Sequence, residues 1–189
     1  MSIYVLDKEY IGLVFKGNEL NHHEFENCTF INCDFRACNF INVTFIDCRI
    51  LDSNLQQTSI NHTKFRTVHF DYCNLKEVNF AMCDASIFEI HFKDCVLDFA
   101  KMYALKLKSC TFVNSSLIAV DFMKADVSGV QFINCDLYRA EFDQANAQKT
   151  DFSSSNHYAI RPEKTKIKKA IFSLQGVQGL LLHHEIIVE

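Results

Sequence analysis

The sequence predicts an all-β protein, built as a four-sided parallel β-solenoid that ends in a short C-terminal helix cap. Three observations predict it: large apolar residues recur every five positions, small residues stand two positions before them, and the large residues form columns of like residues when read in groups of four. A period of five fits neither an amphipathic helix nor a half-buried strand. Short extended stretches must therefore alternate with corners.

The large apolar residues, which we call centres, form two runs separated by a shift of two residues. The first run is Phe25, Phe30, Phe35, Phe40, Phe45, Ile50, Leu55, Ile60, Phe65, Phe70, Leu75 and Phe80, and the second is Ile87, Phe92, Leu97, Met102, Leu107, Phe112, Leu117, Phe122, Val127, Phe132, Leu137, Phe142, Ala147 and Phe152. The columns stay aligned across the shift, so we expect a corner bulge at residues 81–87.

Grouping the centres in fours gives the number of sides of each coil. One column is entirely Leu (Leu55, Leu75, Leu97, Leu117, Leu137) and another entirely Phe (Phe70, Phe92, Phe112, Phe132, Phe152). Groups of three would scramble both columns. We therefore expect coils of 20 residues, about 4.8 Å apart and joined by backbone hydrogen bonds. Phe112 should lie between Phe92 and Phe132 in a dry, apolar core.

Eight of the nine cysteines occupy the small position before a centre, and the ninth, Cys83, lies at the phase shift. A buried cysteine behaves as a small hydrophobic residue. Stacking that places Cys28 over Cys48 also suggests metal or redox chemistry, but zinc sites need thiolates that converge on a local knuckle. We expect packed, reduced and unliganded thiols, with no metal and no cofactor. The chain also lacks a secretory signal, which favours a cytoplasmic location.

Composition and motifs argue against several classes of function. The sequence contains no phosphate-binding glycine loop, nucleophile elbow or HExxH motif, so we expect no catalytic residues and no enzyme. Its eight histidines are scattered or adjacent in pairs, which suits solvated surface. The net charge of −4 disfavours direct nucleic-acid binding. No apolar stretch is long enough to span a membrane.

The five-residue unit, a small residue followed by Asp or Asn, then Leu or Phe, then two polar residues, closely resembles the pentapeptide-repeat family over residues 20–155. The resemblance implies a right-handed quadrilateral β-helix. We divide the chain into an N-terminal cap at residues 1–20, the β-helix at 21–155, and a cap or dimerisation segment at 156–189.

The C-terminal segment departs from the repeat. Ser173 is placed to cap a short helix with Leu174, Val177, Leu180 and Leu181 on one face, and residues 186–188 are expected to form a final strand. The segment also resembles the extension through which some family members dimerise. Two alternatives follow: a cap folded on the last coil, or a homodimer joined through Val177, Leu180, Leu181, Ile186 and Val188.

Acidic residues precede several centres in the later coils, namely Asp121, Asp126, Asp136, Glu141 and Asp151. Some pentapeptide-repeat proteins resemble DNA through such carboxylates and bind type II topoisomerases, DNA gyrase or topoisomerase IV, which gives inhibitor tolerance or immunity. By this resemblance the five residues would form a partner-binding surface. The alternative is that Asp and Asn only solvate the corners, and that the rod is a scaffold or effector-like protein with an unrelated protein partner.

Overall fold

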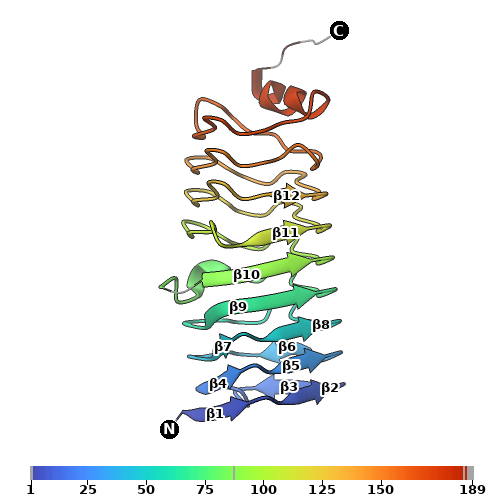
Figure 1. Ribbon diagram of the computed structural model, residues 1–189, viewed down its shortest axis with the longest axis vertical. Helices are drawn as coiled ribbons and strands as arrows, with labels where there is room; N and C mark the ends of the chain where they lie inside the picture. The colour runs from blue at the N-terminus through green and yellow to red at the C-terminus, as the bar shows by residue number, and fades with distance from the viewer. Residues whose placement is uncertain (1, 87, 185, 187–189) are drawn as a thin grey trace.

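The computed structural model of the chain describes residues 2–86, 88–184 and 186, which form a rod of stacked coils (Figure 1). The strands are short and lie on the coils' sides. They are β1 (Ile3–Leu6), β2 (Glu9–Ile11), β3 (Val14–Gly17), β4 (His23–Glu26), β5 (Thr29–Ile31), β6 (Asp34–Cys38), β7 (Thr44–Ile46), β8 (Arg49–Leu51), β9 (Lys64–Asp71), β10 (Phe88–Lys93), β11 (Thr111–Val113) and β12 (Phe132–Ile133). Three 3₁₀ helices complete the fold: η1 (Phe80–Met82), η2 (Gly176–Leu180) and η3 (Leu182–His184).

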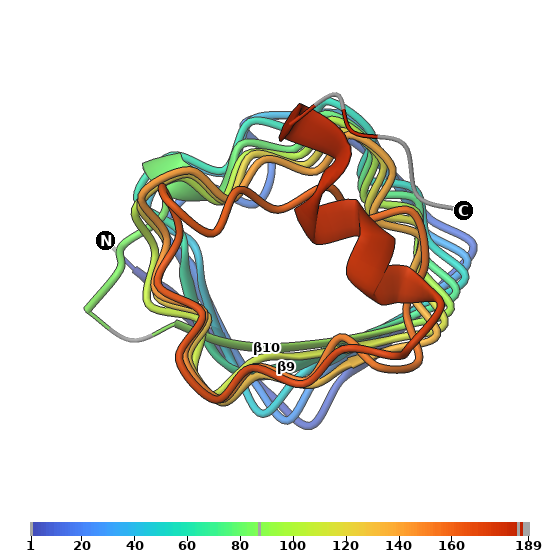
Figure 2. The same cartoon turned by 90° about the horizontal axis from the view of Figure 1, so that it is seen from above.

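All the pairings between strands are parallel, and most join residues 20 positions apart. Phe25 lies opposite Phe45, and Phe92 opposite Phe112. In the later coils the pairing continues as isolated parallel bridges, such as Asp121 with Glu141. The predicted four-sided coil is therefore confirmed, and Figure 2 shows the coils superimposed in a view along the rod.

We name the four sides after the first centre of the main repeat on each. The Phe25 face carries Phe25, Phe45, Phe65, Leu107, Val127 and Ala147, and the Phe30 face carries Phe30, Ile50, Phe70, Phe92, Phe112, Phe132 and Phe152. The Phe35 face carries Phe35, Leu55, Leu75, Leu97, Leu117 and Leu137, and the Phe40 face carries Phe40, Ile60, Phe80, Met102, Phe122 and Phe142. All of these side chains are buried.

Aromatic stacking organises the core as predicted. The Phe112 ring stacks on Phe92 and Phe132 with centroids 5.3 and 5.1 Å away, and Phe122 meets it edge-on at 6.0 Å. Phe112 has no exposed surface. Buried Ser and Thr residues between the centres have hydrogen-bond partners for their hydroxyl groups. The Thr58 hydroxyl, for example, donates to the Phe35 carbonyl of the neighbouring coil at 2.8 Å.

The coils turn at residues with positive φ, which lie two positions after a centre. Asn27, Asn32 and Asn42 have φ of 50°, 51° and 53°. Asn, Asp and Gly tolerate this left-handed conformation best. Asn and Asp therefore serve at many of the corners, and other residues, such as Gln57, Ala119 and Lys124, adopt the same conformation elsewhere.

The stacking is longer than the predicted β-helix of residues 21–155. The first coil begins at Ile3, since β1 pairs with β4, and its inward residues Val5, Phe15 and Leu20 are buried. Parallel bridges continue to Ile171, which lies opposite Asp151. The described residues of the predicted cap at 1–20 thus form a coil of the rod rather than a separate cap, because their apolar residues keep the spacing of five with less typical residue types.

The phase shift is accommodated at the start of β10. The register against β9 shifts between Phe88 and Ile90, and Phe88 lies opposite Phe65. Phe88 therefore fills the position that we assigned to Ile87, which falls outside the described residues. The extra residues form the outward excursion between η1 and β10 seen in Figure 2.

Two 3₁₀ helices, rather than an α-helix, cover part of the C-terminal end (Figures 1 and 2). The Ser173 hydroxyl accepts a hydrogen bond from the Gly176 amide at 2.9 Å, as expected of a cap. Leu180 packs against the core, whereas Leu174 is 89% exposed, so its predicted place on the helix's apolar face is wrong. The helical turn begins only at Gly176, and that leaves Leu174 in the preceding loop.

Glycines set how closely η2 approaches the last coil. Gly179 is buried against the Tyr158 carbonyl, and Gly176 lies against the Tyr158 hydroxyl. A Cβ at either position would overlap Tyr158. Among the described residues, no helix is both long and apolar enough to cross a membrane.

Candidate functional site

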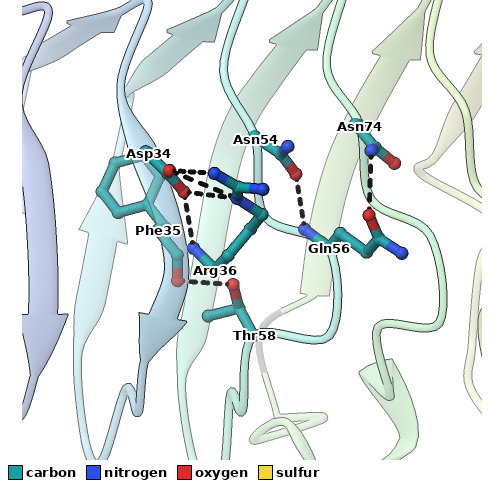
Figure 3. Close-up of polar contacts among 7 residues, drawn as sticks. All are labelled: Asp34, Phe35, Arg36, Asn54, Gln56, Thr58 and Asn74. Carbon is teal, nitrogen blue, oxygen red and sulfur yellow. Dashed lines mark hydrogen bonds and ion pairs between the residues drawn. The ribbon is translucent and has the colours of Figure 1, made fainter.

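The outward Asp or Asn residue before a centre stabilises the backbone turn that follows it. In Figure 3, the Asp34 carboxylate accepts the backbone amide of Arg36 at 3.0 Å, and Asn54 accepts that of Gln56 at the same distance. These bonds span two residues and form Asx turns, which fix the backbone as it approaches the corner. The Asp or Asn of the repeat thus stabilises the turn.

Side chains of neighbouring coils also bond along the rod. Asn74 Nδ2 donates to Gln56 Oε1 of the preceding coil at 3.5 Å, whereas within one coil the Arg36 guanidinium holds the Asp34 carboxylate at 2.6–3.2 Å (Figure 3). The Arg36 guanidinium, through its hydrogen bonds, keeps the pKa of Asp34 below its ordinary value. The outward columns are therefore ordered ladders of polar groups about 4.8 Å apart.

The five predicted acidic residues do not gather on one face. Asp121 and Glu141 stack on the Phe40 face, as their spacing predicts. Asp126 lies on the Phe25 face, Asp151 on the Phe30 face and Asp136 on the Phe35 face, because each precedes a centre of a different column. They form no continuous negative stripe.

Their contacts are those of turn residues with basic neighbours. Asp121, Asp126, Asp136 and Asp151 each accept the backbone amide two residues on, at 2.8–3.1 Å. Glu141 makes no such bond, and its carboxylate lies 3.7 Å from Arg161.

Basic residues lie beside the same carboxylates. Lys108 Nζ is 3.0 Å from Asp126, and His157 Nδ1 is 2.9 Å from Asp136. Burial alone would raise the pKa of Asp126, but hydrogen bonds from Ser128 and Lys108 outweigh it, and the pKa is lowered. In its own column Asp121 follows Lys101. The acidic side chains thus belong to mixed-charge faces.

The predicted dimer residues differ in their placement. Leu180 is part of the cap, Val177 and Leu181 are partly exposed at 38% and 36%, and Ile186 is exposed. Val188 and most of the expected final strand fall outside the described residues. The cap thus accounts for only part of this apolar set.

All nine cysteines are free and buried at the small positions facing the core. Burial raises the pKa of Cys110 to about 12 and that of Cys48 to about 11, so these thiols stay protonated. In the ranges that the structure describes, no group of three or more His, Cys, Asp or Glu residues could hold a metal ion.

Sequence reasoning missed a set of exposed aromatic residues. Phe99, Tyr103 and Tyr138 are 50%, 39% and 51% exposed, and each ring has a cation over it. Phe99 and Tyr138 belong to the Phe35 face, and Tyr103 follows a centre of the Phe40 face. The sequence places Phe99 at a corner, two positions after the centre Leu97, but it does not show that the ring is exposed.

Pentapeptide repeats are also found by comparison with known families. A family named for the pentapeptide repeat region matches residues 23–90, and the family of pentapeptide repeats (8 copies) matches residues 100–137 and 121–156. The chain belongs to the pentapeptide-repeat family. No curated protein matches it significantly.

Solved structures of pentapeptide-repeat proteins share the fold over the whole chain. Two trypsin-treated variants of QnrB1, a plasmid-mediated fluoroquinolone resistance protein, match with TM-scores of 0.75 and 0.66, each at 14% identity. The first match covers 98% of this chain and 99% of that one, and the second covers 100% of both. At this identity the likeness establishes the fold, the right-handed quadrilateral β-helix expected from the repeat, and no more.

Proposed function

We propose that this pentapeptide-repeat protein is a non-enzymatic rod that binds a protein partner through its side faces. The proposal rests on the separate roles of core, backbone and surface in each coil. The centres and thiols fill the core, and the backbone joins one coil to the next. The outward side chains, which neither role uses, form ordered columns. A solenoid with this division offers an extended binding surface. The nine free, buried thiols also fit a reducing compartment such as the cytoplasm.

Photo-crosslinking tests this proposal face by face. A photoreactive amino acid is placed at one exposed outward position on each of the four faces, and the protein is irradiated in cells that make it. We expect covalent adducts with one protein from one or two adjacent faces. An absence of adducts from all four faces, with the protein present and folded, would contradict a partner-binding rod.

The mixed charge of the faces favours an unrelated protein partner over a DNA mimic. A mimic needs carboxylates in a row, whereas Asp126, Asp136 and Asp151 lie on three different faces and basic residues lie beside them. Direct binding of nucleic acid is disfavoured by the net charge of −4.

A second candidate is a type II topoisomerase, gyrase or topoisomerase IV, with fluoroquinolone tolerance as the outcome. The family resemblance and the stacked Asp121 and Glu141 motivate it. A gyrase supercoiling assay with and without a fluoroquinolone decides it. Restored supercoiling that is lost on substituting both acidic residues by Asn and Gln would support this candidate, and unchanged inhibition at excess protein would contradict it.

We also propose that the chain forms a homodimer through its C-terminal helices. Val177 and Leu181 leave apolar surface exposed beyond what the cap covers, as does Leu182 at 64%. A two-fold axis would pair this patch with itself. Light scattering should give a dimer mass that falls to a monomer mass in Val177→Ser/Leu181→Ser, and a concentration-independent monomer in the unchanged protein would refute the dimer.

A further inference from the structure

The Phe25 face is rich in lysine near its C-terminal end. Its last four coils have the centres Leu107, Val127, Ala147 and Ile167, and the outward positions are the residue before each centre and the two residues after it. Of these twelve positions, six hold lysine and one holds an acid, Asp126. All six lysines are exposed. We call them the lysine face: Lys106, Lys108, Lys149, Lys166, Lys168 and Lys169.

Backbone pairing makes the lysine face one continuous surface. Parallel bridges join outward residues of successive coils in the column Lys106, Asp126, Asn146 and Lys166. The Lys149 amide donates to the Lys168 carbonyl at 3.1 Å, so the last two coils also adjoin at the far edge of this side. Three steps of about 4.8 Å between coils give the surface a length of about 15 Å.

The lysines outnumber the acid that lies among them. Lys108 Nζ is 3.0 Å from an Asp126 carboxylate oxygen. In the part of the chain that the structure describes, the other five lysines form no ion pair. Like charges this close repel one another, and an anionic occupant would relieve that repulsion.

The residues that border the lysine face reduce its positive charge without reversing it. Every bordering carboxylate counts as a negative charge, whatever group it accepts from. The adjoining positions on the same coils, and on the coil before them, hold four acids and two lysines: Glu89, Asp143, Asp151 and Glu163, with Lys124 and Lys164. The border thus has two more acids than bases, whereas the face has six lysines against one aspartate.

The opposite end of the Phe25 face is acidic. Around the centres Val5, Phe25 and Phe45, the equivalent positions hold no lysine or arginine and four acids: Asp7, Glu24, Glu26 and Asp47. A long polyanion along this face, such as a nucleic acid, would run from the lysines onto these carboxylates. A flat anionic membrane would cover both ends of the face at once. The lysine face therefore fits a short occupant, and its length corresponds to roughly four or five residues of an extended chain.

A second copy of the chain is a competing occupant, since its own first coils carry those carboxylates. Two copies would lie antiparallel, face to face, about a two-fold axis across the Phe25 face. Asp84, Ala85 and Ser86 project beside this face, between η1 and β10, midway along the rod (Figures 1 and 2). The same axis would bring the projections of both copies together, which opposes a flush contact. A separate acidic segment meets no such obstacle, because it covers only the coils beyond the projection.

A hollow adjoins the last coil of the lysine face. It has a volume of about 500 Å³, and its lining includes Lys164, Lys166 and Lys168 together with Pro162 and Glu163. A carboxylate that enters this hollow would have three lysines and one acid around it. The hollow thus gives an acidic side chain a place at the end of the face.

We infer that the lysine face binds a short acidic segment of the protein partner in an extended conformation. Alternate side chains of an extended segment lie on one side of it. Carboxylates at every second residue would therefore face the rod and meet the unpaired lysines. This inference deepens the proposed function and rests on it, since it names the face and the chemistry of the partner.

Selection from a random dodecapeptide display library tests the inference without knowledge of the partner. The baits are the full chain, Lys166→Gln/Lys168→Gln, and a matched control, Lys93→Gln/Lys101→Gln. The control removes the same two charges from exposed lysines of the Phe30 and Phe40 faces, which form no ion pair within the described ranges. All four substitutions are at the surface, so the three proteins should have closely similar melting temperatures.

We expect the full chain and the control to enrich the same acidic peptides, and Lys166→Gln/Lys168→Gln to lose them. A selected peptide should bind that variant at least tenfold more weakly, and its affinity for the full chain should fall as salt is added. Basic or uncharged peptides, no enrichment, or an equal loss in both variants would overturn the inference.

Further measurements distinguish the other occupants. If an oligothymidylate of twelve nucleotides, or vesicles of phosphatidylcholine and phosphatidylserine, bind more tightly than the selected peptide, the inference is wrong. Salt-sensitive dimers of Val177→Ser/Leu181→Ser that disappear on adding Lys166→Gln/Lys168→Gln would assign the face to a second copy and overturn it as well.

The crosslinking experiment separates this inference from the proposed function. On the Phe25 face the photoreactive residue replaces Ser109, which is exposed beside Lys108. We expect adducts from this position. Adducts from other faces alone would overturn the inference and leave the partner-binding rod intact, whereas an absence of adducts from every face would remove both.

Discussion

Replacing Phe112 by Ala should destabilise the whole rod, because its ring touches both neighbouring coils. The ring has no exposed surface, stacks on Phe92 and Phe132 at 5.3 and 5.1 Å, and meets Phe122 edge-on at 6.0 Å. Removing a fully buried phenylalanine costs about 3–5 kcal/mol through lost burial and the cavity that remains. We expect the upper half of that range, since three aromatic contacts are lost together.

Equilibrium unfolding in urea, followed by circular dichroism, measures this loss. With a slope of about 2–3 kcal/mol per molar, a loss of about 4–5 kcal/mol should lower the midpoint by roughly 1.3–2.5 M. Ile133→Ala is the matched control, because Ile133 lies on β12 beside Phe132 but is 38% exposed on the outer surface. It should cost less than about 1 kcal/mol. Equal losses for the two variants would refute the stacked core.

Three other perturbations test the cap, the histidine stack and the thiols. Gly179→Ala should cost about 1–3 kcal/mol in thermal or urea unfolding, because the new methyl group overlaps the Tyr158 carbonyl; unchanged stability would mean that η2 does not pack as described. Burial, and next to it the stacked His69, lower the pKa of His91 in the folded protein. The unfolded chain therefore takes up a proton at His91 more readily than the folded protein does. The melting temperature should fall as the pH drops below about 6.5, the ordinary pKa of a histidine. His91→Gln should flatten that fall, and an identical pH profile would exclude the group. Because all nine thiols are buried, they should resist a disulfide reagent at neutral pH and all react in urea, and Cys110, whose pKa burial raises to about 12, should be among the most resistant. Rapid reaction of the native protein would show that the core is open.

The core was predictable because its signal is repeated in every coil. One misassigned residue, such as Ile87 for Phe88, hardly alters a column that includes Phe45 and Phe65. The ends were less predictable. There the inward positions hold residues that occur in any sequence, such as Val5 and Leu20, and only the spacing marks them.

The surface was the least predictable part of the molecule. The sequence places Asp121 and Glu141 in one column, but it does not show that Asp121 binds the Met123 amide or that Arg161 approaches Glu141. Exposed aromatics carry no periodic signal. Phe99 shares its left-handed backbone with Ala119 and Arg139 of the same corner column, so only its exposed aromatic ring sets it apart, and that exposure is known from the structure.

The central claim is that four-sided coils of 20 residues stack their side chains in columns. An engineered disulfide between two corner residues tests it most directly. The side chains of Asn114 and Asn134 are hydrogen-bonded at 3.2 Å, and adjacent coils about 4.8 Å apart lie within the range of a disulfide. Mild oxidation of Asn114→Cys/Asn134→Cys should give an internal disulfide in nearly every molecule, detected as a linked peptide by mass spectrometry. Asn114→Cys/Gly129→Cys, whose positions would be adjacent in a three-sided coil, should stay reduced. A disulfide in the second pair and none in the first would contradict the four-sided solenoid and the partner-binding rod that depends on its columns.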